Sequence, residues 1–273
     1  MKIKSFAAAL LVAALLLSIM PTMKIPIAAA VSFTENSLGT FYAGQDIDAL
    51  DVDSDGDIDI IGSAYASGGG VYWYKNDGSG NFTKYSIHTS SSYDYMHIDG
   101  GDIDDDGDID IIVGDRGDGD TDGVVYLYTN DGSENFTRST IGTGLYDPRK
   151  IAIVDVDGDG DQDVTVPNGD YTSTWVGNLR WYENDGSENF TSRYVDSNQP
   201  DSHDIEVGDM NDDGELDIIG SGNSFGNTSK YISNGATPPS FAETYVSHGG
   251  RDVQIIDLDG DSDPDFVKLM SYY

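Results

Sequence analysis

One acidic nine-residue segment recurs five times along the chain and constrains its fold more than any other feature. The first copy runs from Asp51 to Asp59, with acidic residues at its odd positions, a glycine sixth and an apolar residue eighth. Carboxylates this closely spaced repel one another unless a cation lies between them. Calcium takes about six to eight oxygen ligands, and a D-x-D-x-D-G loop wraps carboxylates around it because the glycine permits a sharp turn. We therefore interpret the segment as a calcium loop.

The spacing of the copies predicts a repeat architecture. They start at steps of 51, 53, 54 and 48 residues, and a period of this length is typical of propellers and solenoids. An alternating segment such as Ile47 to Ala49 precedes each loop, and an apolar run such as Ile60-Ile61 follows it. Both patterns indicate strands. The loop starts are Asp51, Asp102, Asp155, Asp209 and Asp257.

Each of the first three repeats continues with an aromatic strand, a tight turn and a fourth strand. In the first repeat these are Val71-Tyr72-Trp73-Tyr74, Asn76-Asp77-Gly78 and the segment opened by Phe82-Thr83. Asn-Gly and Asp-Gly dipeptides are strong hairpin signals. The pattern predicts an all-β protein, a β-propeller of four-stranded antiparallel blades.

The repeats leave the number of blades open. Five are visible, and the last contains only two of the expected strands. One interpretation is a five-bladed ring closed by an N-terminal strand that begins at Ser32-Phe33-Thr34, which would remove open sheet edges. The other is part of a larger propeller, for example a seven-bladed one.

The composition limits the possible partners. The chain has 273 residues, with 49 Asp+Glu against 14 Lys+Arg, a formal net charge of −35 and no cysteine. So acidic a surface repels nucleic acid and anionic membranes. Without cysteine there are no disulfides and no thiolate metal sites, so any stapling comes from packing or from hard cations.

The N-terminus has the plan of a secretory signal peptide. Residues 1–30 contain a short basic start, an apolar run over residues 6–20 and the small residues Ala28 to Ala30. The run is short for a membrane span, which needs about 20 apolar residues, and an uncleaved anchor is the alternative. We expect residues 31–273 to be secreted or at the cell surface, with no membrane insertion after the signal is removed.

The loops, their flanking strands and the Asn-Asp-Gly-Ser-x-Asn-Phe-Thr turns resemble FG-GAP/VCBS-type repeats, which occur in integrin alpha-chain propellers and many secreted microbial proteins. The resemblance covers roughly residues 31–273. It implies an integrin-alpha-like calcium-binding β-propeller with its calcium loops between the first two strands of each blade. It also implies that partners bind at the opposite face or the rim. The family includes adhesion proteins, lectin-like modules and appendages of enzymes, so the resemblance fixes no activity.

We expect up to five Ca2+ ions, one per loop. Positions one, three, five and nine should ligate through side chains and position seven through its backbone carbonyl. Asn211 removes a charge from the fourth loop and Ser262 replaces the turn glycine of the fifth, so these sites should be weaker. An EF-hand needs flanking helices and a glutamate at position twelve, and is rejected. Solvated acidic turns without metal are the other alternative. The expected ligands are Asp51, Asp53, Asp55, Asp57 and Asp59; Asp102, Asp104, Asp106, Asp108 and Asp110; Asp155, Asp157, Asp159, Asp161 and Asp163; Asp209, Asn211, Asp213, Glu215 and Asp217; and Asp257, Asp259, Asp261, Asp263 and Asp265.

The predicted function is a binding or adhesion module for carbohydrate or extracellular protein. Aromatic and cationic residues in the loops at the end opposite the calcium loops offer a platform for either partner. The alternatives are a propeller-fold polysaccharide lyase or hydrolase, and a structural module of a surface assembly. An enzyme is less favoured because His88, His97, His203 and His248 lie in no recognisable nucleophile or zinc motif, and we assign no catalytic residues. The candidate platform residues are Tyr65, Tyr93, Tyr95, Arg116, Tyr146, Arg149, Lys150, Tyr171, Trp175, His203, Phe225 and Arg251.

Overall fold

The computed structural model describes residue 38 and residues 43–65, 69–90, 94–117, 122–169, 177–223, 226–261 and 263–270. The predicted signal peptide and the Ser32-Phe33-Thr34 segment lie outside these residues. The chain divides into two units, Met1–Ser37 and Leu38–Tyr273, and the strands of the described residues lie in the second. The described residues form strands and turns, and they include no helix long and apolar enough to cross a membrane.

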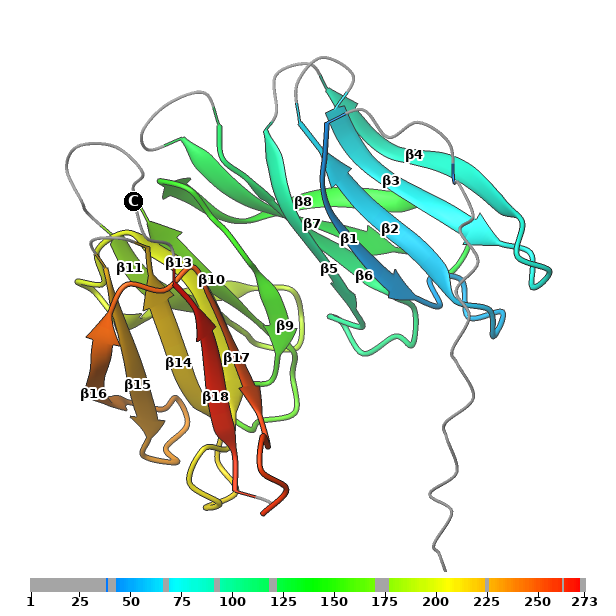
Figure 1. The fold of residues 1–273 in the computed structure, drawn as a ribbon. Helices are drawn as coiled ribbons and strands as arrows, with labels where there is room; N and C mark the ends of the chain where they lie inside the picture. Colours follow the sequence, from blue (N-terminus) through cyan, green and yellow to red (C-terminus); the bar gives the residue numbers. More distant parts are fainter. Residues whose placement is uncertain are drawn as a thin grey trace, which may run out of the picture. The chain divides into compact units, whose positions relative to one another are not determined.

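The strands form five antiparallel sheets, which we call blades 1 to 5 in chain order (Figure 1). Blade 1 contains β1 (Gly44–Leu50), β2 (Asp59–Ala64), β3 (Gly69–Asn76) and β4 (Phe82–Ser90). Blade 2 contains β5 (Tyr95–Gly101), β6 (Asp110–Asp115), β7 (Gly123–Asn130) and β8 (Phe136–Leu145). Blade 3 contains β9 (Ala152–Val154), β10 (Asp163–Gly169), β11 (Gly177–Asn184) and β12 (Phe190–Asp196). Blade 4 contains β13 (Ser202–Gly208), β14 (Asp217–Gly222), β15 (Asn227–Ser233) and β16 (Phe241–His248). Blade 5 contains β17 (Asp252–Ile256) and β18 (Asp265–Leu269).

This arrangement confirms the prediction of four-stranded blades with an incomplete fifth. In blades 1 to 4 each strand pairs with the next one along the chain. The acidic loop joins the first and second strands of every blade, and the Asn-Asp-Gly turn joins the third and fourth strands of blades 1 to 3. Both connections therefore lie at the same end of a blade. The connections between second and third strands, and between blades, lie at the other end.

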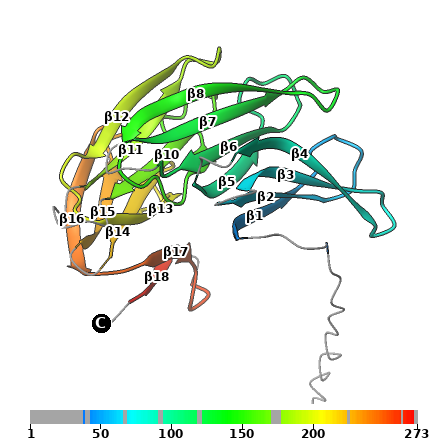
Figure 2. The same ribbon diagram turned by 90° about the horizontal axis from the view of Figure 1, so that it is seen from above.

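The hydrophobic core lies between neighbouring blades, which pack face to face in chain order (Figure 2). Ile61 and Trp73 of blade 1, for example, belong to one cluster with Tyr95 and Ile111 of blade 2. Each of these side chains is at most 1% exposed. Burying a side chain of this size contributes about 1.5–3 kcal/mol, so the contacts between blades stabilise the fold.

One face of β1 departs from the burial pattern expected from the sequence. Ile47 is 65% exposed, although its equivalent Ile98 in β5 is 4% exposed. Ile98 packs in the cluster that blade 1 shares with blade 2. Among the described residues no sheet precedes β1, so the alternation that predicted a buried face at Ile47 finds no neighbour to pack against.

Asparagine side chains add polar links between blades. Asn130 donates through Nδ2 to the backbone oxygen of Val52 in blade 1, at 3.2 Å. Asn184 donates in the same way to the oxygen of Ile103 in blade 2, at 2.9 Å. Both asparagines are buried. The first residue of the Asn-Asp-Gly turn thus also joins its blade to the preceding one.

Carboxylates on the first strands form a second set of links. Asp99 accepts a hydrogen bond from the N–H of Ile153 in blade 3, at 2.9 Å. Burial raises the pKa of Asp99 to about 6, although hydrogen bonds from the N–H groups of Ile153 and Gly100 oppose the shift. Asp204 likewise accepts from the N–H of Val253 in blade 5, at 2.6 Å. In each case a carboxylate on the first strand of one blade binds the first strand of the following blade.

We predict that Asn130→Ala lowers the free energy of unfolding by about 1–3 kcal/mol, because it leaves the buried oxygen of Val52 without its donor. Asn76→Ala is the matched control, since the Asn76 side chain donates to Ile58 of its own blade. Chemical denaturation of both variants measures the difference. Equal losses would contradict a role for Asn130 between blades.

Candidate metal-binding sites

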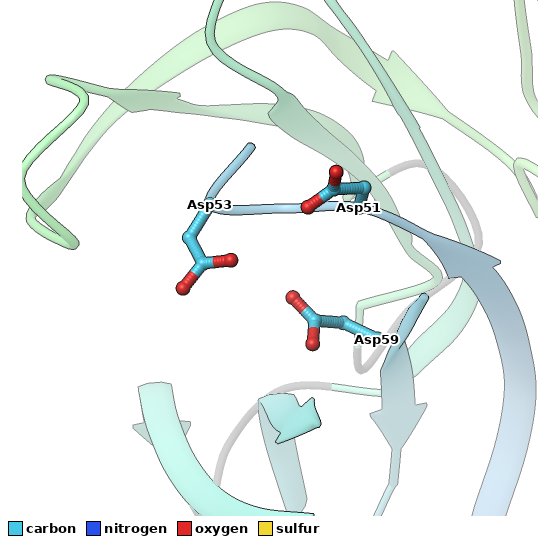
Figure 3. A group of neighbouring side chains, drawn as sticks. All are labelled: Asp51, Asp53 and Asp59. Atoms are coloured by element: carbon cyan, nitrogen blue, oxygen red, sulfur yellow. The ribbon is translucent and has the colours of Figure 1, made fainter. Parts of the chain in front are cut away.

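The first acidic loop brings three carboxylates together. Asp51 follows β1, Asp53 lies two residues further on, and Asp59 opens β2. Figure 3 shows their side chains converging on a common space. One oxygen of each lies within 4.8 Å of the others. A cluster of this size suits a hard cation with oxygen ligands.

The same trio recurs at positions one, three and nine of other loops. It forms in the second, third and fifth loops from Asp102, Asp104 and Asp110; Asp155, Asp157 and Asp163; and Asp257, Asp259 and Asp265. In the fourth loop Asn211 takes the third position, so Asp209 and Asp217 are the remaining carboxylates of the trio. The structure therefore brings together three of the four side-chain positions that we expected to ligate calcium.

The fifth and seventh positions shape the loop. The fifth carboxylate accepts a hydrogen bond from the N–H of the seventh residue, as between Asp106 and Asp108 at 2.9 Å. The Asp108 side chain lies against Gly132 of the same blade's hairpin turn, where a Cβ atom would collide with its carboxylate. Gly132 also has a φ of +67°, which disfavours other residues. Ligation through these positions stays a prediction.

The ninth aspartate is a structural hub that the sequence did not reveal. Asp110 is fully buried, and its Oδ2 accepts from the N–H of Ile103 at 3.0 Å. Its Oδ1 accepts from the N–H of Asn130 at 2.8 Å. One side chain thus closes the loop and fixes the end of the third strand. Asp59, Asp163 and Asp217 make the equivalent pairs of bonds.

Burial makes the charge of these carboxylates costly. It raises the pKa of Asp110 and of Asp163 to about 7, despite the backbone hydrogen bonds that each accepts. Burial, followed by repulsion from Asp159, raises the pKa of Asp157 to about 6. Asp157 is 7% exposed, and neither of its oxygens has a hydrogen-bond partner among the described residues. A buried carboxylate without partners is unfavourable, and a cation between the three side chains would compensate it.

The expected platform at the other end of the blades is partly corrected. Tyr95 is fully buried, with its hydroxyl 3.2 Å from that of Tyr128, so it offers no surface. Arg116 pairs with Asp94, Arg149 with Asp147, and Lys150 with Asp204 and Glu206. Tyr65 is 40% exposed. Tyr93, Tyr171, Trp175 and Phe225 lie outside the described residues.

His203 lies half-buried at the end of the blades opposite the acidic loops. Arg149 donates through Nη1 to its Nε2, at 2.9 Å, and also donates to Asp147. Burial, followed by the charges of Arg149 and Arg251, lowers the pKa of His203 to about 4. His203 is therefore neutral at physiological pH and accepts from the arginine, which links blades 3 and 4.

Comparison with known proteins agrees with the repeat and the loops. The model of the FG-GAP-like repeat family matches residues 51–113 and 102–166. Integrin alpha-4 of Xenopus laevis is 32% identical to the chain over 149 residues. That match covers 47% of this chain and 14% of the integrin, so the chain spans only a small part of its relative.

We predict that Asp110→Asn destabilises the protein by about 1–3 kcal/mol even in excess chelator, because an amide offers one acceptor where two N–H groups need one each. Asp106→Asn is the control, since Asp106 is exposed and accepts within its own loop. Denaturation in chelator compares the two. If both cost the same, the hub role of the ninth aspartate is wrong.

We predict that the stabilisation by calcium grows as the pH rises from about 5 to about 8. The raised pKa values mean that the folded protein holds protons which the unfolded chain releases, so these groups stabilise the chelated protein at low pH and lose that contribution as pH rises through about 7. Calcium requires the ionised form and restores the loss. Thermal unfolding with calcium and with chelator across this range measures the gap. A gap independent of pH would contradict the assignment.

Proposed function

The chain carries FG-GAP-like repeats, and on that premise we propose that it is a secreted or cell-surface calcium-binding β-propeller module that binds an extracellular protein. The observation that supports calcium most directly is the trio of Asp155, Asp157 and Asp163, of which Asp157 and Asp163 are buried. Both Asp157 oxygens lack a hydrogen-bond partner among the described residues. Calcium favours such all-oxygen sites and would neutralise their charge.

The proposed ligands are the side chains at positions one, three, five and nine of each loop and the backbone carbonyl of position seven. Bound ions would offset repulsion in a chain with a net charge of −35. They would also hold each loop between its first and second strands, where the ninth aspartate meets the third. Residues 1–30, proposed as the secretion signal, would deliver the protein to a compartment rich in calcium.

The proposed binding surface is the end of the blades opposite the calcium loops, because the loops there do not repeat in sequence. A protein partner is favoured over carbohydrate by the similarity to an integrin alpha chain, and carbohydrate binding is the second candidate. Exposed Tyr65 supplies an aromatic contact of the kind that either partner uses.

The test is thermal unfolding and partner binding of residues 31–273, with calcium and with excess chelator. If three loops each bind at about 10⁻⁴ M, removing millimolar calcium lowers the melting temperature by roughly 10 °C or more. Arrays of extracellular proteins and of glycans, probed under both conditions, then identify the partner class. Calcium-dependent capture on the protein array supports the proposal. An unchanged melting curve in chelator, with metal removal confirmed by elemental analysis, would overturn it.

A further inference from the structure

A lysine ammonium already lies at the first acidic loop. Lys75 of β3 pairs with Asp53, the third residue of that loop, and with Glu134 of blade 2 at 2.7 Å. The Asp53 side chain is 11% exposed. Its other oxygen, Oδ1, is buried without a hydrogen-bond partner in the described part of the chain. The positive charge of Lys75 therefore contacts Asp53, one of the three carboxylates shown in Figure 3.

The other blades provide internal comparisons for this position. Lys75, Thr129 and Glu183 each precede the asparagine that donates to the ninth aspartate. They also share one register, since each pairs with the threonine that follows the first phenylalanine of the next strand. Blade 1 thus has a cation where blade 2 has a neutral residue and blade 3 an anion.

The glutamates in the hairpin turns of blades 2 and 3 contact these residues of the preceding blades. Glu134 reaches back from the hairpin turn of blade 2 to Lys75. Glu188, at the same place in the turn of blade 3, accepts from the hydroxyl of Thr129 at 2.6 Å. At the second loop the glutamate therefore meets a neutral hydroxyl, and its charge adds to that of Asp104. At the first loop Lys75 joins the glutamate and the loop into one ion-paired link between blades.

We propose that Lys75 is a built-in counter-ion that competes with calcium at the first loop. This inference rests on the proposed calcium-binding function. Calcium can enter the trio of Asp51, Asp53 and Asp59 only by displacing the ammonium from Asp53 or by binding beside it against charge repulsion. The first loop is therefore the weakest of the first three calcium sites. The ion pairs of Lys75 with Asp53 and Glu134 still link blade 1 to blade 2 when the second and third loops have lost their ions.

Trp73 offers a local probe of this loop. Its Nε1 donates to Asp59 Oδ2 at 2.9 Å, and the Lys75 ammonium lies 5.6 Å from the centre of its ring. In a background with Trp175→Phe and Trp181→Phe, Trp73 is the only tryptophan in the chain. Terbium, which substitutes for calcium, is then sensitised by selective tryptophan excitation chiefly when it occupies the first loop.

The experiment titrates terbium into this background with Lys75, Lys75→Thr or Lys75→Met. Threonine is the natural residue of blade 2, and methionine keeps the length of the side chain without its charge. Removing the positive charge should tighten terbium binding at the first loop at least about tenfold in both variants. Equal affinities with and without Lys75 would overturn the inference.

A reciprocal change tests the second loop in the wild-type tryptophan background. Thr129→Lys should lower the bound calcium by roughly half an ion per chain in equilibrium dialysis at about 10⁻⁴ M free calcium, because a loop that binds at about 10⁻⁴ M is half occupied there. The matched control Thr129→Met should not lower it. Circular dichroism confirms that both variants fold. If Thr129→Lys retains the wild-type number of ions, lysine at this position does not compete with calcium. If the wild-type protein binds no calcium at any loop, the proposed function fails and not only the role of Lys75.

Discussion

The structure depends on one buried interaction, which joins the ninth aspartate of each of the first four acidic loops to the two backbone N–H groups that it accepts from. In blade 2 a single carboxylate, that of Asp110, closes the loop at Ile103 and fixes the end of β7 at Asn130. It also faces Asp102 and Asp104. The same atoms that assemble the blade thus create the acidic cluster. Its burial makes the charge unfavourable, and a cation bound in the cluster would offset that cost.

The blades then join through groups that serve two purposes. Asn130 and Asn184 donate their backbone N–H groups to the ninth aspartate and their side-chain amides to the preceding blade. Disturbing an acidic loop therefore disturbs the contact between blades as well. This coupling would give the proposed calcium binding a route to the stability of the packed sheets, which the hydrophobic clusters between blades also hold together.

Most of the fold could be predicted from the sequence, because strands, hairpin turns and acidic loops each have a local pattern that repeats in register. Positions one, three and nine were predicted as neighbours, and their carboxylates lie together in the first, second, third and fifth loops. The contacts between blades were not predicted. The exposure of Ile47, the burial of Tyr95 and the reach of Lys75 to Glu134 depend on which sheet packs on which face. No local pattern of residues encodes that packing.

The trio of Asp155, Asp157 and Asp163 should destabilise blade 3 when no cation lies between its carboxylates and stabilise the blade when one does. The most direct test is the melting temperature of Asp157→Asn against wild type, each measured in calcium and in excess chelator. Removing this charge relieves repulsion but weakens the third calcium site. We expect a crossover, in which the variant melts above wild type in chelator and below it in calcium. A variant that melts below wild type by the same margin in both conditions would contradict it.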